Sequence, residues 1–137
     1  MLKTNSQNES KMAVVGYVNE LTQHTIAKNL VSVCVVGANR HGYISIMRKQ
    51  DVKLGDKVVL FKPNAILPKK RWSKFLYDRY GTGRVRHHSF RKIYSECVAL
   101  PIKSFPELRN KPLRVSEDVS RVLNVTEYKK SYRKIPC

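Results

Sequence analysis

Residues 51–61, with the sequence DVKLGDKVVLF, carry the clearest structural signal in the chain. The turn at 54–56 contains a glycine, which adopts a positive φ without strain, and an aspartate, which can hydrogen-bond the turn backbone. The alternating apolar residues 58–61 follow at once and predict a short strand. A turn that leads directly into such a strand is typical of a small β-barrel.

Apolar, β-branched runs on the N-terminal side of this segment predict three further strands. Residues 13–21 predict a long first strand, in which Gly16 is expected to mark a bend. Residues 30–36 and 43–48 predict the two strands of a hairpin, because glycine and other turn-forming residues fill the connection at 37–42.

On the C-terminal side the pattern is less regular. Residues 94–102 predict the last strand, with Pro101 near its end. Helical periodicity is confined to 70–80 and to 116–123, the second of which begins with a Ser-Glu-Asp capping sequence. Neither helix is long enough to form the core.

These elements predict a mainly β fold, a small five-stranded barrel of the OB-fold type. A long basic insertion is expected before the last strand, together with short helices. Residues 1–11 are polar and predict a disordered tail, whereas residues 12–128 form the expected OB-like domain. Residues 129–137 are expected to be a basic C-terminal tail or linker.

The charge balance predicts an anionic partner. The chain has 27 Lys and Arg residues against 10 Asp and Glu residues, which gives a formal net charge of +17. Nucleic acid and anionic lipid are the usual partners of such a surface. No apolar run approaches the roughly 20 residues that cross a bilayer, and residues 1–12 lack the apolar core of a signal peptide, so no membrane partner is expected.

The cysteines give no support for a disulfide framework or a zinc site. Cys34, Cys97 and Cys137 are odd in number and have no paired spacing. Cys34 and Cys97 lie in apolar runs, where a free cysteine is usually a small core residue. Reduced thiols favour a cytoplasmic or nuclear location.

Residues 62–92 concentrate basic and aromatic side chains and are the predicted nucleic-acid-binding segment. They contain ten basic residues and one acid, Asp78, interleaved with five aromatic rings. Cations neutralise phosphates and rings stack on bases, so this mixture favours nucleic acid over a merely solvated surface loop. The expected phosphate ligands are Arg84, Arg86, Arg91 and Lys92, with a second patch of Lys69, Lys70, Arg71 and Lys74. Either Trp72 or Tyr80 is the expected stacking ring, although Trp72 could instead cap the barrel core.

The sequence offers little for catalysis. It contains no glycine-rich phosphate loop and no clustered carboxylates, so no metal or cofactor is expected. His87 and His88 could serve a metal-free nuclease as acid and base, but adjacent strand residues point to opposite faces. One of the two, His88, is expected to contact RNA.

Four segments, in this order, resemble the N-terminal OB-like domain of nick-sealing RNA ligases, in which an OB module precedes the lysine adenylyltransferase domain. They are the first strand with HTIAKNL (24–30), VKLGDKVVLFKPNAILP (52–68), RVRHHSFRKIYSECVALPI (84–102) and SEDVSRVLNVTEYKK (116–130). The resemblance implies that Arg84, Arg86 and Arg91 occupy positions that the family keeps basic. It also implies RNA or a nicked duplex, and a ligase catalytic domain, as partners.

The chain differs from the family pattern in several places. Residues that replace an expected acid, lysine or glycine are Lys28, Asn64, Ser89, Lys92, Cys97 and Glu127. The chain also lacks the Lys-x-Asp-Gly tetrad that provides the nucleophilic lysine of adenylyl transfer. We therefore expect no enzyme activity from this chain alone, and an accessory role in an ATP-dependent RNA ligase.

Four functions remain open from the sequence. The preferred one is the RNA-binding OB-like domain of an RNA ligase, and the second is a stand-alone protein that binds single-stranded nucleic acid. The third is a protein that uses its basic surface to bind an acidic protein, and the fourth is a small nuclease.

Overall fold

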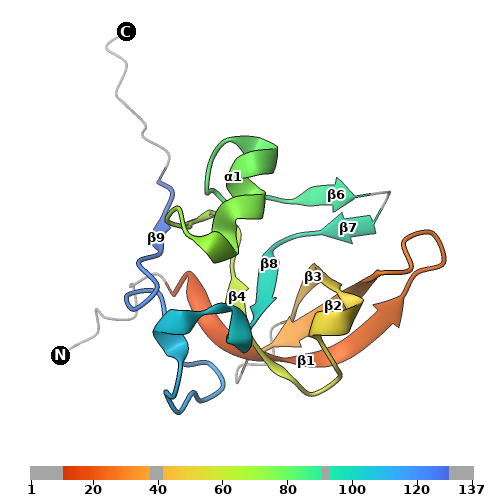
Figure 1. Cartoon of the computed structure of the whole chain (residues 1–137), viewed down its shortest axis with the longest axis horizontal. Coiled ribbons are helices and arrows are strands. Elements are labelled where there is room, and N and C mark those ends of the chain that lie inside the picture. Colours follow the sequence, from red (N-terminus) through yellow and green to blue (C-terminus); the bar gives the residue numbers. More distant parts are fainter. Residues whose placement is uncertain (1–10, 38–41, 91–92, 130–137) are drawn as a thin grey trace, which may run out of the picture.

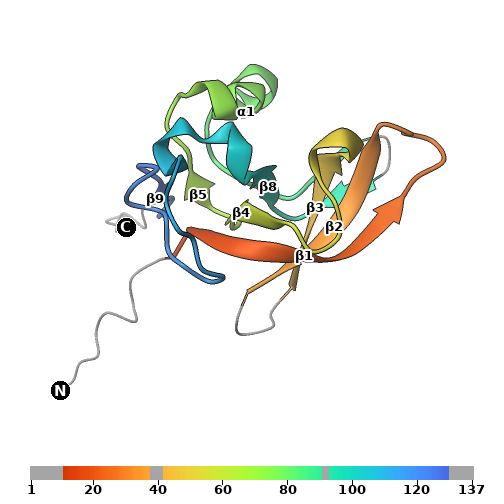
Figure 2. The same cartoon turned by 60° about the horizontal axis from the view of Figure 1, so that its bottom comes forward.

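The computed structural model describes residues 11–37, 42–90 and 93–129. Its main feature is a curled, five-stranded antiparallel sheet with strand order β3-β2-β1-β4-β8 (Figures 1 and 2). The strands are β1 (Ala13–Gln23), β2 (Leu30–Val36), β3 (Gly42–Arg48), β4 (Lys57–Phe61) and β8 (Val98–Pro101). This arrangement confirms the mainly β, OB-like barrel. Most of the two predicted tails, and Arg91 and Lys92, lie outside the described residues.

The long first strand is shared by both halves of the sheet. Residues 13–17 of β1 pair with β4, and residues 17–23 pair with β2. The register shifts between Val18 and Glu20, so the irregularity lies beyond Gly16, where the sequence suggested a bend. A Cβ at Gly16 would lie 2.6 Å from the Val35 side chain, so the glycine permits close approach of β2 instead.

Side-chain hydrogen bonds join β3, one edge strand of the sheet, to residues 95–99, which lead into the other edge strand, β8. The Ala99 N–H donates to Ser45 Oγ at 3.1 Å. The Ile46 N–H donates to Ser95 Oγ at 3.2 Å. Because both serines are buried, these contacts satisfy backbone groups that water does not reach.

The last predicted strand is broken in two, which corrects the expectation of one strand at 94–102. β7 (Ile93–Ser95) pairs with β6 (His88–Phe90), and β8 begins only at Val98. Between them Glu96 turns toward β3, where its N–H donates to Ile44 O and its carboxylate accepts from the Ile44 N–H, both at 3.0 Å. The strand breaks because Glu96 pairs with Ile44 across the barrel seam, the line along which β3 meets β7 and β8.

Two apolar clusters lie on opposite faces of β1 and β4. Val14, Val18, Val58 and Leu60 belong to the cluster that β2, β3 and β8 complete. Ala13, Val15, Val59 and Phe61 belong to the second cluster, which the insertion and the C-terminal segment complete. The strands are apolar on both faces because both are covered.

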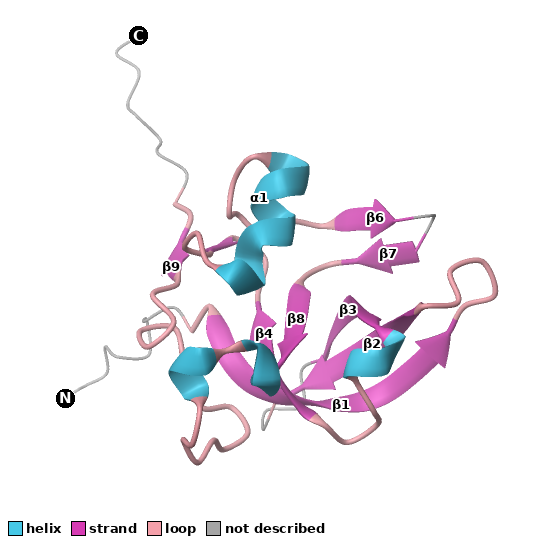
Figure 3. Cartoon of the chain, viewed as in Figure 1, coloured by secondary structure: helices cyan, strands magenta, loops and turns pink. Residues whose placement is uncertain are grey.

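The insertion supplies a short helix that packs on the second cluster. It contains β5 (Ala65–Ile66), a 3₁₀ turn η3 (Arg71–Ser73) and α1 (Lys74–Tyr80), which confirms the helix predicted at 70–80 (Figure 3). Gly81, with φ 73°, ends the helix in the left-handed region that favours glycine. Short 3₁₀ turns also occur at η2 (Lys49–Asp51), η4 (Ile102–Ser104) and η5 (Pro106–Leu108).

The helix predicted at 116–123 does not form. Instead, the Val119 N–H donates to Ala13 O and the Val15 N–H donates to Glu117 O, both near 2.9 Å. The segment covers the part of β1 that β2 leaves unpaired, which protects an open strand edge. Farther on, β9 (Thr126–Glu127) pairs with β5. None of the helices in the described ranges is long and apolar enough to cross a membrane.

Candidate nucleic-acid interface

The insertion forms or borders three hollows. The first, the lysine patch, is lined by Lys69, Lys70, Arg71, Lys74, Tyr77, Asp78 and Gly81. The second, the arginine pocket, is lined by Tyr80, Thr82, Arg84, Arg86 and His87. The third, the β3–β8 pocket, lies between β3, β8 and α1. The first two share no residue but meet where Gly81 is followed by Thr82, at the end of α1.

The lysine patch is exposed and keeps most of its positive charge. Lys74 Nζ lies 2.6 Å from Asp78 Oδ2, and Lys70 Nζ lies 3.8 Å from Glu107 Oε2. Lys69 lies 5.5 Å from the centre of the Tyr77 ring. In the described part of the chain, Lys69 and Arg71 have no carboxylate at salt-bridge distance. Exposed ion pairs are weak, so all four cations remain available to an anion.

Arg84 is held in place by two segments distant in sequence. Its Nε and one terminal nitrogen donate to Asn64 Oδ1 at 3.2 and 2.9 Å, and its guanidinium lies 3.6 Å from the centre of the Tyr128 ring. Asn64 has φ 76°, and its carbonyl accepts from the Tyr128 N–H. Because Asn64 is uncharged, it orients the guanidinium without neutralising it. Arg84 is therefore a pre-organised cation with donors left for a phosphate.

Arg86 and two histidines complete this region. Arg86 and His87 are exposed, whereas His88 is half-buried. His88 makes an edge contact with Tyr80 at 6.1 Å between ring centres, and His87 makes one with Tyr94 at 5.9 Å. His87 lines the arginine pocket and His88 lines the β3–β8 pocket. Because the two histidines line different hollows, they do not face a common substrate.

The structure separates the two candidate stacking rings. Trp72 is 7% exposed, stacks on Phe61 at 5.7 Å and donates from Nε1 to Glu107. Trp72 therefore packs in the core, which the sequence allowed as the alternative to stacking on a base. Tyr80 is 42% exposed, with the Arg79 guanidinium 5.7 Å from its ring centre, so this ring is accessible to a base.

Two further exposed rings were not singled out from the sequence. Phe75 on α1 and Tyr94 on β7 are each nearly half exposed. Phe75 lies next to buried Leu76 and three residues after buried Trp72, a helical spacing that predicts all three on one apolar face. The signal for Tyr94 was its position between Ile93 and Ser95, because strand residues alternate between faces and both neighbours are buried.

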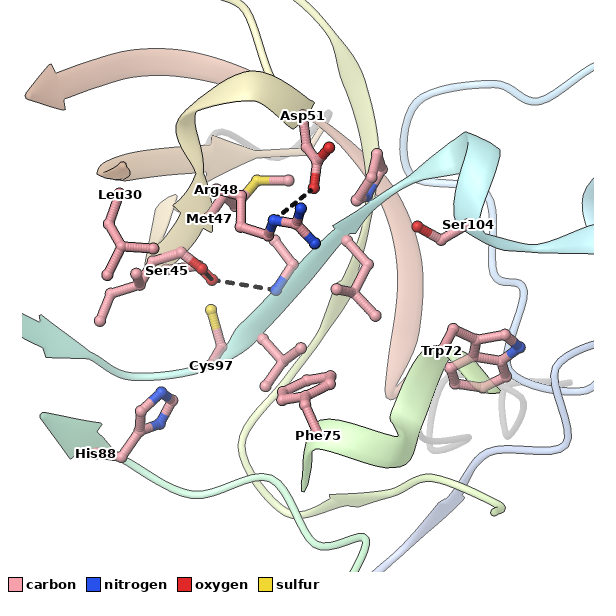
Figure 4. A pocket seen from close by; sticks show the side chains of 15 residues that line it. Leu30, Ser45, Met47, Arg48, Asp51, Trp72, Phe75, His88, Cys97 and Ser104 are labelled. Carbon is pink, nitrogen blue, oxygen red and sulfur yellow. Dashed lines mark hydrogen bonds and ion pairs between the residues drawn. The ribbon is translucent and has the colours of Figure 1, made fainter. Parts of the chain in front are cut away.

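The β3–β8 pocket has a volume of about 390 Å³ (Figure 4). Residues of β8 lie along it, with Phe75 and His88 on one side and Arg48 and Asp51 on the other. Arg48 Nε lies 3.7 Å from Asp51 Oδ2. The pocket thus combines an exposed ring with one cationic and one anionic group.

The described residues hold no group of three or more His, Cys, Asp and Glu side chains suited to a metal ion. Cys97 is fully buried, and burial raises the pKa of its thiol above the ordinary value. Burial also raises the pKa of Cys34, which is less enclosed. Both cysteines therefore have the environment of packing residues rather than reactive thiolates.

Comparisons with solved structures show that the fold is similar to part of an RNA ligase. No protein-family model matches the chain, and no curated protein matches it in sequence. A mutant Naegleria gruberi RNA ligase with ATP and manganese is similar in structure, with a TM-score of 0.77 at 22% identity over 91% of this chain. An apo mutant of the same ligase gives a TM-score of 0.73 at 23% identity over 88%. At this identity the likeness shows the fold.

The likeness is confined to part of the ligase. The aligned region makes up 37% of the first ligase chain and 36% of the second. The form of the same ligase with pyrophosphate gives a TM-score of 0.73, and again 37% of its chain is covered. This chain therefore spans little more than a third of the ligase that it matches.

Proposed function

We propose that this chain is the RNA-binding, OB-like domain of an RNA ligase, which engages the backbone and bases of RNA or of a nicked duplex to support end joining. The observation that carries the proposal is the structural likeness to part of the Naegleria gruberi RNA ligase, which extends over about nine-tenths of this chain. Adenylyl transfer would be supplied by a separate catalytic domain, because this chain has no Lys-x-Asp-Gly tetrad.

The described residues support this role chemically. Arg84 and Arg86 offer guanidinium groups to phosphates, and Arg84 is already oriented by Asn64 and Tyr128. The lysine patch extends the cationic surface past the end of α1. Tyr80 lies within the arginine pocket, where its ring can stack on a base next to a bound phosphate. The phosphate-binding role proposed for Arg91 and Lys92 rests on the sequence alone.

A stand-alone protein that binds single-stranded nucleic acid is the second candidate. The exposed rings favour it, because Tyr80, Phe75 and Tyr94 can stack only on bases that are not enclosed in a duplex. A nick exposes few such bases, whereas a single strand exposes all of them. The ligase domain is therefore expected to bind a nicked duplex more tightly than a single strand, and the stand-alone protein is expected to show the reverse order.

Binding measurements test both candidates. Fluorescence anisotropy would compare a nicked RNA duplex, the same duplex intact, and a single strand of the same sequence, each over a range of salt concentrations. We expect the nicked duplex to bind most tightly, with an affinity that falls steeply as salt rises, because bound cations release counterions. A preference for the single strand would favour the second candidate. Affinity for an acidic protein and none for nucleic acid would contradict both.

A matched pair of variants would locate the interaction. Arg86→Gln removes an exposed charge from the arginine pocket, and Arg121→Gln removes one from outside the three hollows. We expect the first variant to weaken binding and to lower the salt slope by roughly one unit. The second should change neither quantity appreciably.

A further inference from the structure

We propose that the β3–β8 pocket receives one unpaired base of the bound RNA. This proposal rests on the proposed function and adds a pocket that can enclose a base turned out of the stacked strand, beyond the exposed ring that Tyr80 offers. Its volume of about 390 Å³ falls within the roughly 300 to 1,000 Å³ typical of ligand pockets. The lysine patch and the arginine pocket, in contrast, are lined mainly by charged and polar side chains.

The lining suits the two surfaces of a base. Phe75, 45% exposed, offers a ring face or edge, and Ile46 and Leu100 add apolar surface from β3 and β8. Arg48 and Asp51 stand across the pocket from Phe75 (Figure 4). The guanidinium donates hydrogen bonds and the carboxylate accepts them. A base that packs on Phe75 would therefore find a partner for either kind of group on its edge.

The ion pairs around Asp51 favour a neutral, polar guest over a bare phosphate. Asp51 lies 3.7 Å from Arg48 and 3.6 Å from Lys103, measured between charged atoms. The carboxylate offsets cationic charge at the pocket, so an anion gains less here than at Arg84. A nucleobase is uncharged, so the carboxylate does not repel it and can accept a hydrogen bond from its edge.

The pocket is continuous with the proposed path of the RNA backbone. His88 lines the β3–β8 pocket, and its ring contacts Tyr80, which lines the arginine pocket. These two rings form the boundary between the hollows. A strand with a phosphate at Arg84 or Arg86 can therefore pass Tyr80 and turn a neighbouring base into the pocket. An apolar peptide would fill the pocket equally well, but it would gain nothing from the adjacent arginines.

Replacement of Phe75 tests the proposal. Phe75→Ala removes an exposed ring, and we expect it to weaken binding of a short unstructured RNA by roughly 5- to 150-fold. Inorganic polyphosphate, which has charge but no bases, should bind the variant and the parent protein equally. Phe75→Tyr keeps a ring and should restore RNA affinity. Tyr17→Ala removes an exposed ring from β1, outside the pocket, and should bind RNA as the parent protein does.

Tryptophan fluorescence gives a local readout that does not depend on affinity. Trp72 is the only tryptophan in the sequence, and it lines the pocket. Saturating RNA should change its emission in the parent protein and in Tyr17→Ala, and should change it much less in Phe75→Ala. Equal thermal unfolding midpoints would show that the variants are folded.

The outcomes separate this proposal from the one on which it rests. If the parent protein binds no RNA, the proposed function fails and the pocket proposal fails with it. If RNA binds with a steep salt dependence but Phe75→Ala binds it unchanged, only the base pocket is overturned. RNA that leaves the Trp72 emission constant, or an uncharged apolar peptide that competes with RNA and itself changes this emission, would overturn it as well.

Discussion

Cys97 shows how the barrel seam determines the chemistry of a single residue. Its side chain is fully buried where the chain enters β8, with Sγ 3.4 Å from Ile44 O. Burial raises the pKa of its thiol, and the negative charges of Glu96 and Cys34 add to the shift. The Cys97 thiol is therefore held in its neutral form.

The raised pKa predicts a loss of stability in alkali. Above the ordinary thiol pKa, near 8.5, the unfolded chain releases a proton that the folded chain retains at Cys97. Stability is therefore fully present below this pH and should fall above it by at most about 1.4 kcal/mol per pH unit. Urea unfolding at about pH 7.5 and about pH 10 would measure the decline.

Cysteine variants test whether Cys97 causes this decline in stability. Cys97→Ala should flatten the pH dependence, although Tyr43, whose pKa burial also raises, should keep part of it at higher pH. Cys34→Ala is the matched control and should have a smaller effect, because Cys34 is less enclosed. Identical pH dependence in the parent protein and Cys97→Ala would contradict the assignment.

At the scale of elements, two buried serines hold β3 against β7 and β8. Ser45 Oγ accepts from the Ala99 N–H, and Ser95 Oγ accepts from the Ile46 N–H and donates to Cys97 O at 2.9 Å. Within the described residues, β3 forms no regular ladder with β7 or with β8. The serines therefore provide hydrogen bonds that a continuous strand pair would supply from its backbone.

Removal of either hydroxyl should destabilise the fold. Ser45→Ala leaves the Ala99 N–H without its partner, and Ser95→Ala does the same to Ile46. We expect each to lower the free energy of unfolding by about 1–3 kcal/mol in urea titrations. Ser89→Ala, at an exposed position, should change it by less than about 0.5 kcal/mol. The proposed role of the seam would be wrong if all three variants were equally stable.

The seam also marks the limit of prediction from sequence. Alternation of apolar residues predicted β1 to β4 well, because each strand is paired along its length and its pattern is locally complete. It did not predict the break at Glu96, because that break depends on Ile44, which is distant in sequence. Helical periodicity and the Ser-Glu-Asp capping sequence likewise predicted a helix at 116–123, where pairing with the free edge of β1 prevails.

The same limit applies to the candidate site. Composition identified residues 62–92 as cationic and aromatic, and the structure gathers most of the described basic residues named there into hollows. Periodicity placed Trp72 and Phe75 together, but it could not tell which ring would meet Phe61 and Phe105. Nor could it show that Asn64 and Tyr128 would hold Arg84, because these contacts join three separate segments.

At the scale of the whole molecule, the insertion has one buried side and one exposed, cationic side. Trp72 and Leu76 fix α1 on the outer face of β1 and β4. This anchoring sets the lysine patch and the arginine pocket on either side of Gly81, at the end of the helix. The two hollows are therefore separate sites held at a fixed spacing. A polyanion must be long enough to pass the end of α1 before it can occupy both.

This spacing predicts that the salt dependence of binding grows with RNA length. A single strand that reaches both hollows should lose roughly two units of salt slope in the triple variant Lys69→Gln, Lys70→Gln, Lys74→Gln, since each phosphate contact contributes about 0.7 units. The control Lys28→Gln, Lys53→Gln, Lys111→Gln removes the same charge from exposed positions outside the hollows and should leave the slope nearly unchanged. A very short RNA should occupy only the arginine pocket, where Arg84 is pre-organised, and the lysine variant should then have little effect. Equal losses for both variants at every RNA length would mean that net charge alone governs binding.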